Sequence, residues 1–143
     1  MTDLAKLFAP SLEDFERLAE KAYATLPALF RRHAAGVIIH VEDFPTDDVL
    51  DELGAESPFD IMGLFEGTGL AQGGEHTASG SLANRVFLYR RPILDYWAEN
   101  EETLGAVITH VLVHEIGHHF GLSDEDMEAI EAREDPAPRP RRN

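Results

Sequence analysis

The chain has 143 residues, 43% of them hydrophobic, which is enough for one compact domain with its own core. Its 27 acidic residues outnumber its 12 lysines and arginines and give a formal net charge of -15, so we expect no nucleic-acid partner. Cysteine is absent from the sequence. This excludes disulfides, thiolate metal sites and thiol nucleophiles, and leaves His, Asp and Glu as the strong metal ligands.

The start of the sequence carries no sign of a targeting segment. Residues 1–10 contain one lysine and lack the apolar run of a signal peptide. No segment approaches the roughly 20 apolar residues of a membrane span. We therefore expect a cytoplasmic protein with no membrane partner. We expect a single domain over 1–133 and a flexible tail over 134–143, which holds three prolines and three arginines.

The N-terminal part of the chain predicts two helices and a strand. Ser11 and Asp14 have the spacing of a capping box, and the apolar residues after them recur at helical spacing, which predicts a helix over 12–26. Pro27 fits the first turn of a short second helix. The β-branched run over 37–41 predicts a strand, which we expect at the centre of the sheet.

The middle of the chain predicts short elements and one long loop. Thr46 can cap a short acidic helix over 47–53, and residues 59–65 predict a second strand. Residues 66–84 are rich in glycine and show no apolar periodicity, so they form either a functional loop that covers the substrate or a disordered insertion. A third strand is predicted over 86–89.

The C-terminal part predicts three helices. Pro92 can open the first of them, and Asn100 is a suitable N-cap for a long helix that runs to about Phe120. Because apolar residues of this long helix point in nearly all directions, we expect it to be buried on most sides. Ser123 can cap a last helix that runs to about Arg133. The fold class expected is α+β, with a small mixed sheet packed against the long helix.

The long predicted helix carries a metal-binding pattern. His114 and His118 are four residues apart, so they share one helix face and both imidazoles can reach one ion. Glu115 lies about 100° around the helix from His114, where its carboxylate could act as a general base on a water without being a ligand. Alternatively, His114 and His118 are only polar residues on a buried helix, and Glu115 is an ordinary helix residue or a salt-bridge partner.

Gly121 and Asp124 extend this pattern. In an unbroken helix Asp124 would lie about 9 Å beyond His118 along the axis, too far to share a metal. Gly121 can adopt the left-handed conformation that ends a helix and turns the chain, so that Asp124 could be the third ligand. Asp124 could instead only stabilise the start of the last helix, and Glu125 or Asp126 could then replace it. Three protein ligands and one open position are typical of catalytic zinc.

Five residues of this chain resemble the extended zinc motif of the zincin metallopeptidases: His114, Glu115, His118, Gly121 and Asp124. The motif is close to that of the metzincin group, but Asp124 stands where that group has a third His. Over about residues 11–132 the chain is similar to a family of small bacterial proteins described as minimal zincin-like, or matrix-metalloprotease-like, metallopeptidases. This resemblance implies a compact zincin-like α+β fold, bound Zn²⁺ and peptidase activity. Metzincins also have a methionine-containing turn downstream, whereas Met127 falls inside the last predicted helix.

Several other residues could pack or take part in chemistry. We expect His119 to pack or to hydrogen-bond a ligand, while His110 could lie in the cleft and His76 could help to cover the substrate. Gly117 suggests the close approach of another backbone. Three aromatic residues are expected in the core: Tyr89, Tyr96 and Trp97.

The function that the sequence favours is a zinc-dependent peptidase that acts on a peptide or protein substrate. The substrate could align as an added strand along an exposed edge of the sheet. Two alternatives stay open, because no oxyanion-stabilising group can be assigned from the sequence. One is a non-catalytic zinc-containing module that binds peptides, and the other is a zinc amidase that acts on a non-peptide amide.

Overall fold

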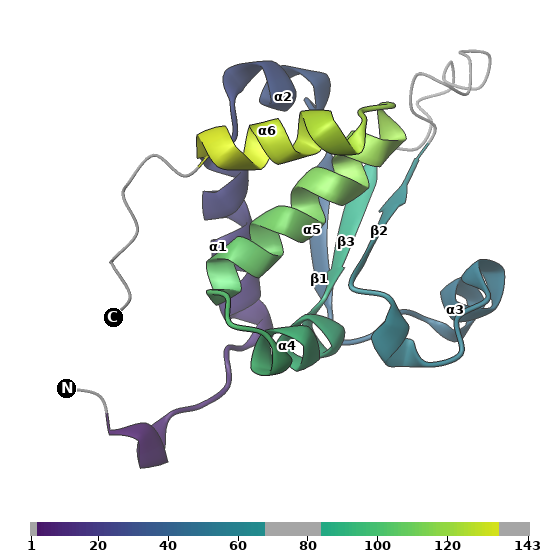
Figure 1. Ribbon diagram of the computed structural model, residues 1–143. Coiled ribbons are helices and arrows are strands. Elements are labelled where there is room, and N and C mark those ends of the chain that lie inside the picture. The colour runs from purple at the N-terminus through teal and green to yellow at the C-terminus, as the bar shows by residue number, and fades with distance from the viewer. Residues whose placement is uncertain (1–2, 68–83, 135–143) are drawn as a thin grey trace.

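A computed structural model describes residues 3–67 and 84–134, and their arrangement is α+β, as predicted (Figure 1). In chain order the elements are a 3-10 helix η1 (Leu4–Lys6), α1 (Leu12–Ala24), α2 (Ala28–His33), β1 (Ile38–Glu42), α3 (Asp47–Leu53), a 3-10 helix η2 (Pro58–Asp60), β2 (Gly63–Glu66), β3 (Arg85–Tyr89), α4 (Arg90–Glu99), α5 (Leu104–His119) and α6 (Asp124–Glu134). The glycine-rich loop and the C-terminal tail fall almost wholly outside the described residues.

The described strands form one mixed sheet in the order β1-β3-β2. β1 runs parallel to β3, and β2 runs antiparallel to it. The prediction of a central position for residues 37–41 is wrong, because β3 is the middle strand of the three. Val86 and Leu88 of β3 are fully buried, whereas Ile38 of β1 is 46% exposed. A β-branched run favours a strand but does not fix its place in a sheet, which depends on long-range pairing.

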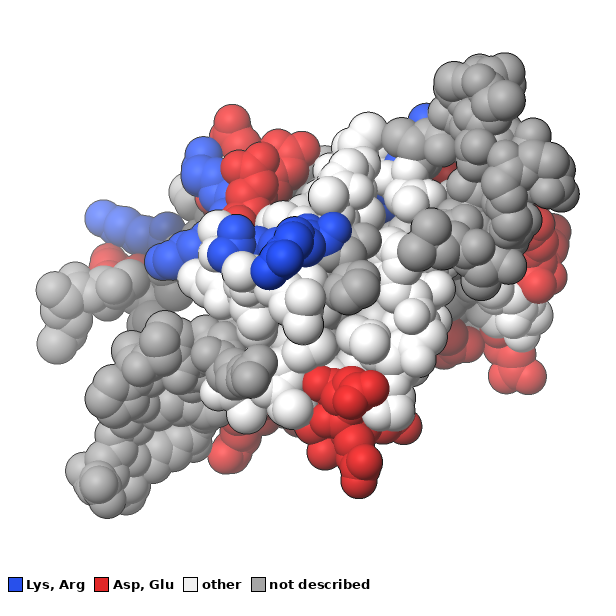
Figure 2. Space-filling view, turned by 90° about the horizontal axis from the view of Figure 1, so that it is seen from above, with Lys and Arg blue, Asp and Glu red and all other residues white. Residues whose placement is uncertain are grey.

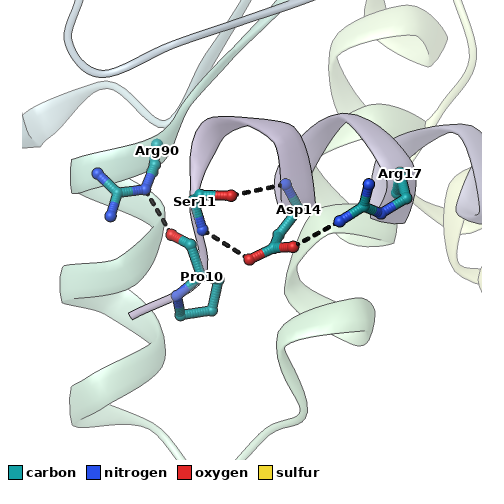
Figure 3. A network of polar contacts seen from close by, with 5 residues as sticks. All are labelled: Pro10, Ser11, Asp14, Arg17 and Arg90. Carbon is teal, nitrogen blue, oxygen red and sulfur yellow. Dashed lines mark hydrogen bonds and ion pairs between the residues drawn. The ribbon is translucent and has the colours of Figure 1, made fainter. Parts of the chain in front are cut away.

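The start of α1 is held by a network of polar contacts (Figure 3). Ser11 Oγ accepts a hydrogen bond from the Asp14 amide at 3.1 Å, and Asp14 Oδ2 accepts one from the Ser11 amide at 2.9 Å, which is the predicted capping box. These bonds, together with Arg17 at 2.9 Å, hold the pKa of the Asp14 carboxyl below its usual value. Arg90 Nε donates to the Pro10 carbonyl at 2.6 Å and so joins the start of α1 to the start of α4.

The second strand is shorter than predicted. β2 begins at Gly63, and the first two residues of the predicted strand, Phe59 and Asp60, lie in η2 instead. Ser57 Oγ accepts from the Phe59 amide at 3.1 Å, while Asp60 Oδ2 accepts from the Ser57 amide at 3.1 Å. This local side-chain capping competes with the extended conformation and turns the chain before it joins the sheet.

The cap of the long helix also differs from the prediction. Thr103 is the N-cap of α5, and its Oγ1 accepts from the Ala106 amide at 3.1 Å. Asn100 instead follows the end of α4, where its Nδ2 donates to the Tyr96 carbonyl at 2.8 Å. α4 also begins at Arg90, before the proline expected to open it.

α5 lies at the centre of the fold and is buried on most sides, as predicted. It packs on β2 and β3, beside α1 and α4, and α6 folds back over it (Figure 1). Its fully buried residues include Ile108, Leu112 and Ile116. Of the aromatic residues expected in the core, Tyr89 is buried and Trp97 packs against the core, but Tyr96 is 37% exposed, so that prediction was wrong for Tyr96.

The surface charge is distributed over several groups. On the face shown in Figure 2, Lys and Arg side chains gather near the middle, and Asp and Glu side chains form separate groups around it. Among the helices of residues 3–67 and 84–134, none is long and apolar enough to cross a membrane.

Candidate metal centre

The end of α5 is a tight turn centred on Gly121. This glycine has φ +81°, the left-handed conformation that the sequence predicts. The Leu122 amide donates to the Gly117 carbonyl at 2.9 Å, and the Gly121 amide donates to the His118 carbonyl at 3.1 Å. This pair of bonds is the Schellman arrangement that closes a helix and redirects the chain. The turn allows α6 to start beside the last turns of α5.

The first turn of α6 separates the roles of its acidic residues. Asp126 forms a capping box with Ser123: its Oδ2 accepts from the Ser123 amide at 3.2 Å, and its own amide donates to Ser123 Oγ at 3.0 Å. Asp124 points to α5 instead, with its Oδ1 3.6 Å from His118 Nε2. Of these two carboxylates, Asp124 is therefore the one placed to share a metal with the histidines.

The three residues expected to bind metal come together in the structure. His114, His118 and Asp124 each offer a ligand atom within 4.8 Å of the others. Two ligands of one tetrahedral zinc ion lie about 3.3 Å apart. The 3.6 Å between His118 and Asp124 is therefore close to a binding geometry. The Asp124 side chain is 82% exposed and that of His114 only 23%, so the site is open on the α6 side.

Glu115 lies against the neighbouring strand β2. Its side chain is largely buried, and burial raises the pKa of its carboxyl, while His118 and the backbone amide of Phe65 lower it. Gly63 makes this close contact possible, because a Cβ at that position would lie 3.2 Å from Glu115 Cγ and 2.6 Å from Val111 Cγ1. The glutamate is thus held between α5 and the start of β2.

A cleft of about 480 Å³ runs between β2 and α5. The segment from Ile61 to Leu64 lines one side, and three of the expected site residues line the other: His114, Glu115 and His118. His110 also lies in this cleft, as expected. Both candidate histidine ligands and the candidate base therefore line one concave surface beside β2, whereas Asp124 is not among its lining residues.

The structure adds a carboxylate that the sequence analysis missed. Glu131 of α6 lies with Oε1 3.2 Å from His110 Nδ1 and Oε2 3.1 Å from His114 Nε2. His110, His114 and Glu131 form a second group whose ligand atoms all lie within 4.8 Å. A signal was present in the sequence, because Glu131 follows Asp124 by seven residues, or about two helical turns.

The remaining expectations concern packing. His119 stacks on Phe65 with ring centroids 3.8 Å apart, and burial lowers its pKa. Its Nε2 has no hydrogen-bond partner among the described residues, and the stack on Phe65 fits the expected packing role. Gly117 is approached by a side chain and not by a backbone, since a Cβ there would lie 2.6 Å from Met127 Sδ. His76 lies outside the described residues.

Comparison with protein families identifies the family of the chain. A model described as zincin-like metallopeptidase matches residues 34–134. The chain belongs to this family. The matched segment runs from just before β1 to the end of α6 and includes both helices of the candidate metal centre. A comparison with curated proteins gave no match. Membership of a metallopeptidase family indicates a zinc-dependent hydrolase of peptide bonds.

Proposed function

We propose that this zincin-like protein is a zinc peptidase in which His114, His118 and Asp124 hold the ion and Glu115 is the general base. The observation that carries the proposal is the meeting of these three ligand atoms within 4.8 Å, beside the largely buried carboxylate of Glu115. Both histidines and Glu115 line one cleft. The donor set suits zinc, because two imidazoles and one carboxylate leave a fourth position open. When bound, zinc supplies a Lewis acid and a water of lowered pKa.

Glu115 is placed to move protons in this cleft. It follows the first histidine of the motif but points to β2, so it borders the metal centre without joining the ligand group. Burial raises the pKa of its carboxyl, which suits a base that must also return a proton, while His118 and the backbone amide of Phe65 partly offset this by stabilising its charged form. We assign it two steps: it accepts a proton from water as the amide carbonyl is attacked, and it then gives that proton to the leaving nitrogen.

The substrate in this proposal is a peptide that lies along β2. Within the described residues β2 pairs with β3 on one side only, and the cleft is lined by the residues at its start. An extended peptide could add to the other side through main-chain hydrogen bonds, which bind many sequences at similar strength. The scissile bond would then cross α5 beside Glu115.

The test compares Glu115→Gln with the wild type, measuring bound zinc and cleavage of a peptide library on the same samples. Glutamine keeps the size of the side chain but cannot accept the proton, so hydrolysis should fall by a factor of about 10² to 10⁴ while zinc stays bound. Glu128→Gln, at an exposed position on α6, is the matched control and should cleave at the wild-type rate.

Two outcomes would contradict the proposal. Wild-type cleavage by zinc-loaded Glu115→Gln would show that Glu115 is not the base. A wild-type protein that retains zinc and binds peptides, but leaves every amide in the library intact, would instead favour the non-catalytic binding module.

A further inference from the structure

Three histidines follow one face of α5 at intervals of four residues, and α6 places a carboxylate beside each successive pair. Asp124 lies beside the pair formed by His114 and His118, and Glu131 lies beside the pair formed by His110 and His114. The two groups share His114 and are otherwise separate. Each contains two imidazoles one helical turn apart and one carboxylate from the same neighbouring helix.

We propose that His110, His114 and Glu131 form a second binding site for a divalent transition metal such as Zn²⁺. The two nitrogen–oxygen distances, 3.2 Å to His110 and 3.1 Å to His114, are close to the roughly 3.3 Å between two ligands of one tetrahedral ion. Each carboxylate oxygen faces a different imidazole nitrogen, and one ligand atom from each of the three residues lies within 4.8 Å of the other two. Imidazole and carboxylate are ordinary zinc ligands.

This second group is more enclosed than the first. The exposed fraction of the Glu131 side chain is 26%, compared with 82% for Asp124. Of the two histidines that the groups do not share, the side chain of His110 in the second group is 50% exposed and that of His118 in the first group is 60% exposed. An enclosed carboxylate already in contact with both histidines loses less conformational freedom on binding an ion than an exposed one. The second site is therefore at least as well prepared for a metal as the first.

The shared histidine makes the two sites compete. A neutral imidazole has one acceptor nitrogen, so His114 can serve one ion at a time. Each chain then holds one ion, divided between the two groups in proportion to their affinities. That competition rests on the proposed peptidase site, whereas metal binding by His110, His114 and Glu131 does not.

Another role for Glu131 must be distinguished from this one. A carboxylate often accepts a hydrogen bond from a metal-bound histidine and orients its ring. In that case Glu131 would support only the site with His118 and Asp124. The two roles differ in whether Glu131 still contributes to zinc binding when His118 is removed.

The experiment measures zinc affinity by competition with a chromophoric chelator, and records the visible spectrum of bound Co²⁺, in a His118→Asn background. His118→Asn lacks one ligand of the first group but keeps all of the second, so it should still bind one ion per chain. Adding Glu131→Gln should then weaken zinc binding by at least roughly 10- to 100-fold, which is the loss usually seen when a residue that only hydrogen-bonds a metal ligand is replaced. Adding Glu128→Gln, an exposed acid on the same helix, should change nothing.

His118→Asn combined with His110→Asn gives a second route to the same loss, through a half-exposed position on α5. Circular dichroism on every variant shows that the fold is kept. If His118→Asn binds no zinc, or if neither second substitution weakens its binding, the second site does not exist. If Glu131→Gln weakens zinc binding in the wild-type background but not in the His118→Asn background, Glu131 only orients His114 for the first site. An inactive wild type would count against the peptidase but would leave these affinities unchanged.

Discussion

Replacing Gly63 by alanine tests how closely β2 lies against α5. A Cβ at this position would lie 2.6 Å from Val111 Cγ1, 3.0 Å from the Phe87 carbonyl oxygen and 3.2 Å from Glu115 Cγ. The carbonyl belongs to the central strand of the described sheet and cannot move freely. Val111 is buried, and a β-branched side chain in a helix has essentially one favoured rotamer, so it cannot turn away at low cost.

The expected loss of stability follows from these contacts. Adding a methyl group to a close-packed site usually costs about 1 to 3 kcal/mol, and a cost of about 2 kcal/mol reduces the ratio of folded to unfolded protein about 30-fold. Gly105 is the matched control, because a Cβ there meets nothing within 4 Å. Gly105→Ala, in the first turn of α5, should raise stability by up to about 1 kcal/mol through helix propensity.

Urea unfolding measures both changes. The single tryptophan of the sequence, Trp97, packs against the core and reports unfolding by fluorescence. The measurement is made with a metal chelator present, so that zinc binding does not add to the free energy of unfolding. Opposite signs for Gly63→Ala and Gly105→Ala are the expected result. If Gly63→Ala is as stable as the wild type, β2 does not lie this close to α5, and the placement of Glu115 at the cleft is wrong.

Two further predictions concern the turn after α5 and the alkaline limit of stability. Gly121→Val should destabilise the fold by at least about 1 kcal/mol in urea unfolding and weaken zinc retention, because φ +81° disfavours a β-branched residue. Gly121→Asn should keep more of the stability and of the bound zinc, because asparagine tolerates the left-handed conformation. Equal stability of the wild type and both variants would contradict a left-handed residue at this turn. Burial, with the carboxylates of Glu42, Glu66 and Glu115, raises the pKa of Tyr89 to about 12. In the unfolded chain this tyrosine has a pKa of about 10 and loses its proton at lower pH than in the folded protein. The free energy of unfolding should therefore fall as pH rises above about 10. Between about pH 9 and pH 11, urea unfolding should show a smaller fall in this free energy for Tyr89→Phe than for the wild type.

Much of the local structure could be predicted because it depends on neighbouring residues. The caps at Ser11, Thr46 and Ser123 all form, since each side chain reaches the amide three residues ahead. The turn at Gly121 also forms, because a helix of this sequence can end there in a left-handed residue. The cap of α5 was missed because Asn100 and Thr103 are both suitable caps, and spacing alone does not choose between them.

The arrangement of distant segments was harder to predict. The place of β1 at the side of β3 is set by pairing across a long stretch of chain, which no local pattern records. Glu131 was missed for a related reason, since its contact with His114 depends on how α6 lies across α5. Periodicity identified the helices but not the face that α6 presents to its neighbour.

The crossing of α5 and α6 explains why both carboxylates reach the histidines. Met127 is fully buried, and its sulfur occupies the space that a side chain at Gly117 would need. Asp124, Met127 and Glu131 are separated by three and four residues, so they lie on one face of α6. Once Met127 is seated against Gly117, one carboxylate lies about one turn to either side of it, each beside a different part of the histidine row on α5. The same packing contact therefore positions both candidate ligand groups, and this is why one helix can offer two overlapping sites that compete for His114.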